Sequence, residues 1–112
     1  MSELARKLQL KQETIRVVNR PAGVALDLPM ADDAEAVLVF VTDAAELEAY
    51  GGAALAAARA DRLAWIAYPK GGQRGTDLNR DLLWARLTDE GVRPVRQVSI
   101  DEVWSALRFR PA

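Results

Sequence analysis

Five polar residues that follow one apolar stretch of the chain could hold an anion. They are Lys70, Arg74, Asp77, Asn79 and Arg80, and glycines lie between several of them. Lysine and arginine supply positive charge, and glycine leaves backbone amides accessible to phosphate or carboxylate oxygens. A helix that begins beside them adds the positive end of its dipole. We therefore take these five residues as the candidate ligand-binding site.

The same residues also suit an ordinary surface connection. In that alternative either Arg80 would pair with Asp101 or Asn79 would bind an exposed backbone group, and the contact would brace the terminal hairpin. Glycine and polar residues are common in connections that bind nothing. Both interpretations of the segment stay open at the level of sequence.

Most familiar catalytic chemistry is absent from the chain. It has no cysteine and no histidine, which excludes thiolate nucleophiles, imidazole bases and the Ser-His-Asp arrangement within one chain. Lys70 and Asp77 could transfer protons if burial lowered the pKa of the lysine. Asp77 and Asp81 lie one helical turn apart and could share Mg²⁺, but a carboxylate there also stabilises the helix dipole. We expect a non-catalytic domain, with no metal and no cofactor.

Three segments predict the parallel part of a sheet. Residues 36–41 and 62–68 are almost continuously apolar, as in strands that are covered on both faces. Residues 14–19 are rich in β-branched side chains and predict an earlier strand. Residues 20–35 predict a loop with at most one helical turn, near 24–28. The candidate site follows the third strand, at the edge where α/β proteins place ligands.

Capping residues locate the helices. Ser2 predicts the start of a short helix over 2–8, and Asp43 with Glu46 predicts an alanine-rich helix that runs to residue 60, with a break at glycines 51 and 52. Thr76 or Asp77 is expected to cap a further helix through residue 89. The buried side of that helix is expected to carry Leu78, Leu82, Ala85 and at least one of Leu83 and Leu87.

Two strands, 92–100 and 103–110, complete the expected sheet. The connection between them is too short for a parallel crossover, so they form an antiparallel hairpin. One face of the last strand is expected to point into the core. The other, half-exposed face carries Trp104, Ala106, Arg108 and Arg110. Together with Arg96 and Gln97 these arginines form either a basic surface or a charged edge that discourages association. Tryptophans 65, 84 and 104 are expected to pack in the interior.

Composition limits the class of protein. A chain of 112 residues, 50% of them hydrophobic, supports a single domain over 1–112. Residues 1–61 carry 6 basic and 10 acidic side chains, net −4, whereas 62–112 carry 9 basic and 6 acidic, net +3. An excess this small favours a small anion over nucleic acid. The longest apolar run is far shorter than the roughly 20 residues that span a membrane, and the amino terminus lacks a signal-peptide core. We expect a cytoplasmic protein without a membrane partner.

Three motifs carry a resemblance to a known family. They are Trp-Ile-Ala-Tyr-Pro-Lys at 65–70, Asp-Leu-Asn-Arg-Asp at 77–81 followed by Trp84, and the segment 93–111 with its Arg-Pro-Val-Arg-Gln-Val start. In these the chain resembles small bacterial proteins of unknown function. The order of strands is similar to a class I methyltransferase domain that has lost its early strand-helix units. The sequence departs from the family pattern at Gly71, where a second basic residue is expected.

The resemblance implies an α/β fold: a three-layer, Rossmann-like sheet of about five strands, the first three parallel, closed by the antiparallel hairpin. We do not expect methyl transfer, because the first strand is followed by a single glycine, at Gly23, and the ribose-binding unit is missing. The leading hypothesis is a domain that binds a small anionic ligand or a protein partner at the carboxyl edge of the sheet. The alternatives are a small enzyme that uses Lys70 and Asp77, and a structural homodimer formed through the hairpin.

Overall fold

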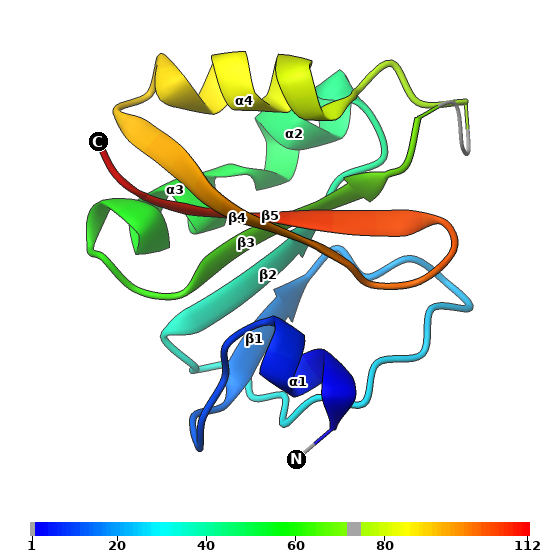
Figure 1. Ribbon diagram of the computed structural model, residues 1–112, viewed down its shortest axis with the longest axis vertical. Helices are drawn as coiled ribbons and strands as arrows, with labels where there is room; N and C mark the ends of the chain where they lie inside the picture. Colours follow the sequence, from blue (N-terminus) through cyan, green and yellow to red (C-terminus); the bar gives the residue numbers. More distant parts are fainter. Residues whose placement is uncertain (1, 72–74) are drawn as a thin grey trace.

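The computed structural model describes residues 2–71 and 75–112, so Arg74 lies outside the described residues. The helices are α1 (Glu3–Lys7), α2 (Ala44–Tyr50), α3 (Gly52–Arg59) and α4 (Arg80–Thr88). The strands are β1 (Ile15–Val18), β2 (Ala36–Phe40), β3 (Ala64–Pro69), β4 (Val92–Ser99) and β5 (Trp104–Pro111). The strands form one sheet in the order β1-β2-β3-β5-β4 (Figure 1).

The sheet is mixed. Strands β1, β2 and β3 are parallel, and β5 is antiparallel to both β3 and β4. The predicted α/β fold, with three parallel strands followed by an antiparallel hairpin, is confirmed. Because β5 lies between β3 and β4, β4 is the edge strand of this end of the sheet. Pro94 and a register shift between Pro94 and Arg96 interrupt that edge, as expected for a strand without an outer partner.

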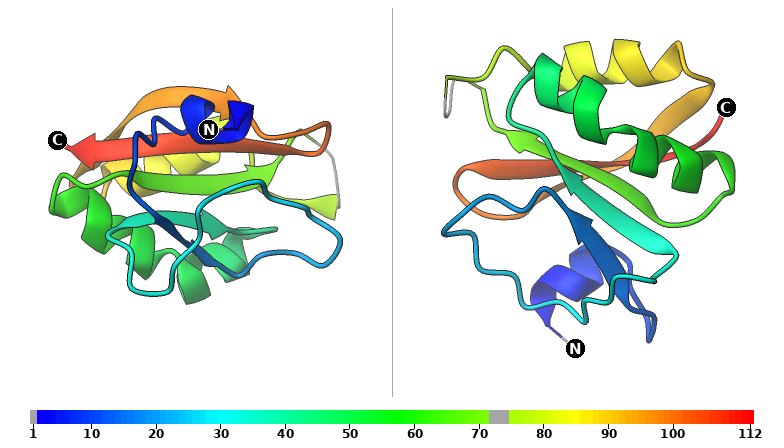
Figure 2. Two further views of the ribbon diagram at one scale, coloured as in Figure 1. Left: turned by 90° about the horizontal axis from the view of Figure 1, so that it is seen from below. Right: turned by 180° about the vertical axis from the view of Figure 1, so that it is seen from behind.

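Helices α2, α3 and α4 lie on one face of the sheet (Figures 1 and 2). The core beneath them contains Val39 and Ile66 from the parallel strands, Leu107 from β5 and Leu83 from α4, each at most 2% exposed. None of the described helices is long and apolar enough to cross a membrane.

The predicted break between α2 and α3 is confirmed. Asp43 caps α2 by accepting a hydrogen bond from the backbone N–H of Glu46 at 2.8 Å, and α2 ends at Tyr50. A Cβ at Gly51 would lie 2.6 Å from the carbonyl oxygen of Leu47, so glycine is required where the two helices meet. Gly52 then opens α3 without such a restriction.

Helix α1 and the segment 19–35 lie on the other face (Figure 2). Ser2 caps α1, as predicted, by accepting from Ala5 N–H at 3.0 Å. Trp65 of β3 is fully buried beneath α1 and donates its indole N–H to the carbonyl oxygen of Leu8 at 3.0 Å. The segment is a loop, as predicted, with no helical turn over 24–28, and it packs leucines 26 and 28 against the sheet.

The interior packing expected for Trp65 and Trp104 is confirmed, whereas the half-exposed face expected for Trp104 and the interior position expected for Trp84 are wrong. Trp104 is 1% exposed rather than half-exposed, because this face of β5 is covered at that end, and its ring meets Phe40 edge-on at 5.1 Å. Trp84 is 47% exposed rather than interior, since the buried side of α4 carries Leu83 and Leu87. Leu82, at 49% exposed, also lies outside the core.

The start of α4 differs from the prediction. Asn79, not Thr76 or Asp77, is the N-cap, and its Oδ1 accepts from Leu82 N–H at 2.9 Å. Three candidate caps, Thr76, Asp77 and Asn79, lie within four residues, so the local signal does not decide among them. Leu78 is 4% exposed, which anchors the chain just before Asn79 and sets the helix start there.

Candidate functional site

A shallow pocket of about 220 Å³ lies at the carboxyl end of β3. Its lining comes from the end of β3, the start of α4 and the two strands of the hairpin. The lining residues are Tyr68, Lys70, Gly71, Asn79, Arg80, Gln97 and Ser105. Three of the predicted site residues, Lys70, Asn79 and Arg80, therefore meet at one pocket. Asp77 does not line it.

Lys70 links the end of β3 to the turn of the hairpin. Its backbone N–H donates to the carbonyl oxygen of Val103 at 2.7 Å. Its ammonium donates to Ser99 Oγ at 2.8 Å and to the carbonyl oxygen of Asp101 at 2.6 Å. A lysine ammonium has three N–H donors, so one remains for another acceptor. The expected contact between Arg80 and Asp101 is thus replaced by one from Lys70, which binds the backbone carbonyl of Asp101.

Arg80 is the most accessible cation of the pocket. Its side chain is 55% exposed, and its one ion pair with the described residues joins Nε to the neighbouring carboxylate of Asp81 at 3.6 Å. A guanidinium offers five N–H donors in a planar fork that matches phosphate and carboxylate oxygens. Most of these donors face solvent, so Arg80 can bind an incoming anion without breaking a structural contact.

Tyr68, Gln97 and Ser105 form the polar floor of the pocket. Gln97 Nε2 donates to the Tyr68 hydroxyl at 3.0 Å, and Ser105 lies opposite Tyr68 in the register of β3 with β5. Burial raises the pKa of Tyr68 above its usual value, which the positive charge of Arg80 and hydrogen bonds with Ser105 and Gln97 partly offset. The Tyr68 hydroxyl therefore stays protonated at neutral pH and can act as a donor.

Sequence reasoning did not place Tyr68, Gln97 and Ser105 at the site. Gln97 and Ser105 lie far along the chain from Lys70 and reach it through strand pairing. One signal was available: each is polar and falls on the face of the hairpin that carries Leu107 and Phe109 in the core. Ser105 is 6% exposed, and a buried polar side chain on an otherwise apolar face is informative because it needs a hydrogen-bond partner there.

Asp77 and Asn79 have structural contacts of their own. Asp77 Oδ1 accepts from the backbone N–H of Ala44 at 2.9 Å, at the start of α2. Asp77 therefore ties the segment before α4 to a neighbouring helix. The ammonium of Lys70 bonds to neutral oxygens of the hairpin instead, so these two residues do not form the acid-base pair that an enzyme would use. Across the described residues, no group of three or more acidic side chains is placed to hold a metal ion.

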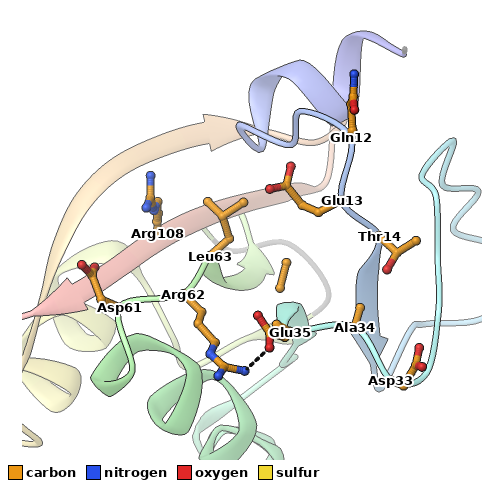
Figure 3. Close-up of a pocket in the computed structure, with 11 residues that line it drawn as sticks. Gln12, Glu13, Thr14, Asp33, Ala34, Glu35, Asp61, Arg62, Leu63 and Arg108 are labelled. Atoms are coloured by element: carbon orange, nitrogen blue, oxygen red, sulfur yellow. Dashed lines mark ion pairs between the residues drawn. The ribbon is translucent and has the colours of Figure 1, made fainter.

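A larger hollow, of about 680 Å³, lies at the opposite, amino end of the parallel strands (Figure 3). Carboxylates from the segments that precede β1, β2 and β3 line it: Glu13, Asp33, Glu35 and Asp61. Arg62 and Arg108 are its two cations, and Arg62 pairs with Glu35 at 3.1 Å. Because carboxylates outnumber cations, this hollow repels anions.

The two hollows thus differ in the sign of their charge. An anion fits the smaller one, where Lys70 and Arg80 meet neutral donors. Comparison of the chain with protein-family models, with curated proteins and with solved structures found no match.

Proposed function

We propose that this protein is a non-catalytic binding domain that holds a small anion in the pocket at the carboxyl end of β3. The observation that carries the proposal is the meeting of Lys70 and Arg80 above the polar floor of Tyr68, Gln97 and Ser105. The pocket thus combines two positively charged side chains with neutral hydroxyl and amide groups that can donate hydrogen bonds. Asp81, which pairs with Arg80 on the solvent side, is the one carboxylate in contact with these cations among the described residues.

The size of the pocket limits the ligand. Pockets for drug-sized molecules measure about 300–1,000 Å³, whereas this one measures about 220 Å³. A phosphate group or a small carboxylate fits that volume, and the remainder of a larger ligand would extend into solvent. We therefore favour a compact anion, or the phosphate of a sugar phosphate, over a ligand that is enclosed as a whole.

The fold supports the same place for a ligand. Three parallel strands followed by an antiparallel hairpin are the arrangement that the resemblance to a truncated class I methyltransferase domain implies. We also propose that the fold is a three-layer, Rossmann-like one, with α2, α3 and α4 on one face of the sheet and α1 on the other. In open α/β sheets, ligands bind beyond the carboxyl ends of the strands.

A hairpin homodimer has less support. It would depend on exposed polar groups of β5, but Arg108 and Arg110 already bond within the chain, to Gln9 at 2.6 Å and to Asp61 at 2.9 Å. We do not propose it as the function.

A thermal-shift titration tests the anion proposal. The wild type would be titrated with inorganic phosphate, sulfate, acetate and a sugar phosphate at constant ionic strength. A ligand at one hundred times its Kd stabilises the folded state by about 2.7 kcal/mol. Arg80→Gln should reduce that shift, whereas Arg86→Gln, on the same helix but paired with Glu48 on another flank, should not.

Two results would contradict the proposal. The first is that none of the four anions stabilises the wild type. The second is that Arg80→Gln and Arg86→Gln weaken binding equally, because the effect would then follow net charge rather than the pocket.

A further inference from the structure

Trp84 is a large aromatic side chain that the packing of the fold leaves half in water. It belongs to α4 and is 47% exposed, because Leu83 and Leu87 occupy the core side of that helix. Within the described part of the chain its indole makes neither a ring contact nor a side-chain hydrogen bond. Both the flat face of the ring and its N–H are therefore open to a ligand.

Trp84 lies on the flank of α4 that carries Arg80. Residues four apart occupy the same side of a helix, and Arg80 lines the anion pocket together with Gln97 of β4. Arg86 lies about 200° around the helix from Trp84, and it pairs with Glu48 of α2 on the opposite flank. The indole therefore belongs to the side of α4 that borders the pocket, away from α2.

The direction of helical side chains brings this ring toward the pocket. Side chains on a helix lean toward its N-terminus, so a residue covers the surface of the turn before it. For Trp84 that turn begins with Arg80, directly after Asn79, which also lines the pocket. Four residues span about 6 Å along the helix axis. A ligand with a phosphate in the pocket can thus reach the ring through a linker of about one sugar.

We propose that the ligand of the anion pocket is a nucleoside monophosphate, whose phosphate binds Lys70 and Arg80 and whose base stacks on Trp84. This inference rests on the proposed function and makes its ligand specific. The pocket of about 220 Å³ accommodates a phosphate but not a whole nucleotide, so the sugar and the base lie outside it, along the flank of α4. Every nucleobase has a flat π face, and stacking on an exposed aromatic side chain contributes directly to binding.

The charges around the pocket favour one phosphate over a chain of them. Lys70 has one N–H donor left, and Arg80 offers its planar fork to the same group. The carboxylate of Asp81 lies on the solvent side of Arg80, 3.6 Å from its Nε. A second phosphate extending outward from the first would meet this negative charge, whereas an uncharged sugar and base would not.

A protein partner suits this flank less well. A stable protein interface takes about 800 Å² from each partner and has an apolar centre. Among the described residues, the one large exposed apolar side chain of β4 is Val95, and the exposed Arg93 and Arg96 lie close to it on either side. Pro94, which has no N–H, interrupts the edge along which a further strand would pair. A single ring beside an anion pocket matches one base better than a protein surface.

Isothermal titration calorimetry with three probes separates the parts of the ligand. Adenosine 5′-monophosphate carries phosphate, sugar and base, ribose 5-phosphate lacks the base, and adenosine lacks the phosphate. Adenosine 5′-monophosphate should bind at least about fivefold more tightly than ribose 5-phosphate, because only the nucleotide stacks on Trp84. Adenosine should bind more weakly than the nucleotide, since it leaves Lys70 and Arg80 without an anion.

Substitutions of exposed side chains assign these differences to residues. Trp84→Ala should weaken binding of the nucleotide about tenfold and that of ribose 5-phosphate less than about twofold, whereas Trp84→Phe should retain most of the affinity. Tyr50→Ala is the matched control, because Tyr50 is an aromatic residue of α2 that is 42% exposed and does not line the pocket. Arg80→Gln should weaken binding of both phosphate probes by the same factor.

Tryptophan fluorescence gives a second readout. Trp65 and Trp104 are 0% and 1% exposed, so quenching by acrylamide reports mainly on Trp84. The nucleotide should protect this fluorescence from acrylamide, whereas ribose 5-phosphate should not.

The outcomes distinguish failure of this inference from failure of the proposed function. If no phosphate-bearing probe binds, the proposed function is wrong and this inference falls with it. If ribose 5-phosphate binds and the nucleotide binds no more tightly, the anion pocket stands and the nucleotide inference is overturned. Equal losses of nucleotide affinity in Trp84→Ala and Tyr50→Ala, or adenosine that binds as tightly as the nucleotide, would also overturn it.

Discussion

Lys70→Met separates the two roles that the structure gives this lysine. Methionine keeps a long apolar side chain but removes the ammonium, and with it the hydrogen bonds to Ser99 Oγ at 2.8 Å and to the carbonyl oxygen of Asp101 at 2.6 Å. Hydrogen bonds from charged groups contribute about 1.5–3 kcal/mol each when they are buried. Both of these are solvent-accessible, so we assign about 1 kcal/mol to each and expect a loss of about 2 kcal/mol.

Urea denaturation measures this loss directly. The midpoint should fall while the slope m stays constant, because the substitution leaves the extent of the fold unchanged. Ser99→Ala removes the bond from the ammonium to Ser99 Oγ and also the bond that this hydroxyl donates to the carbonyl oxygen of Asp101 at 3.1 Å, so it should cost at least half as much as Lys70→Met. The double variant with Lys70→Met should then cost less than the sum of the two, since the residues share an interaction. Lys11→Met is the control: Lys11 is exposed, and its loss should change stability by less than about 0.5 kcal/mol.

Hydrogen exchange locates the effect. Asp101 Oδ1 accepts from the backbone amides of Val103 and Trp104, both at 2.8 Å, so the turn is a compact hydrogen-bonded unit next to Lys70. Loss of the ammonium should speed exchange at these two amides more than at amides in β2. If Lys70→Met is as stable as Lys11→Met and exchange at the turn is unchanged, the ammonium does not brace the hairpin and this reasoning is refuted.

Three further predictions follow from single contacts. Asn79→Ala should destabilise the protein by about 1 kcal/mol, measured in urea, because α4 loses its N-cap, whereas Asn79→Asp should retain most of the stability. Gly51→Ala should lower Tm, since its Cβ would lie 2.6 Å from a carbonyl oxygen of the preceding turn, while Gly52→Ala has open space and should raise Tm slightly. The hydrogen bond from Arg110 lowers the pKa of Asp61 below its ordinary 3.8. The stability that this interaction contributes is therefore present above about pH 4 and is lost as the pH falls through the lower pKa of the folded state. Asp61→Asn should flatten the acid limb of a plot of unfolding free energy against pH, measured by urea denaturation.

The parts of the fold that the sequence predicts are those that neighbouring residues determine. The continuous apolar runs predict β2 and β3 because strands covered on both faces need no alternation. The two-residue connection at 101–102 predicts an antiparallel hairpin because no parallel crossover is that short. Asp43, three residues before Glu46, predicts the start of α2 because the cap acts on its own first turn. Each of these depends on contacts within a few residues.

The errors arise where distant segments decide the outcome. Alternation in β5 assigned Trp104 to a half-exposed face, but that face is buried at this end of the strand. Aspartate is a common helix N-cap, yet the carboxylate of Asp77 accepts a hydrogen bond from the backbone N–H of Ala44 at the start of α2. At the site, Lys70, Asn79 and Arg80 could be predicted because they are close in the chain. Ser105 could not, because only the pairing of β3 with β5 places it opposite Tyr68.

Bracing of the hairpin and binding of an anion are compatible roles for Lys70. Both acceptors of its ammonium, a serine hydroxyl and a backbone carbonyl, are neutral. These contacts fix the position of the positive charge but do not cancel it, whereas a carboxylate partner would have done so. A cation held in place by neutral oxygens has already lost the side-chain entropy that an anion would otherwise have to remove on binding. The brace therefore prepares Lys70 for a ligand, while Arg80, which among the described residues pairs with the exposed carboxylate of Asp81, supplies the second positive charge on a more exposed side chain.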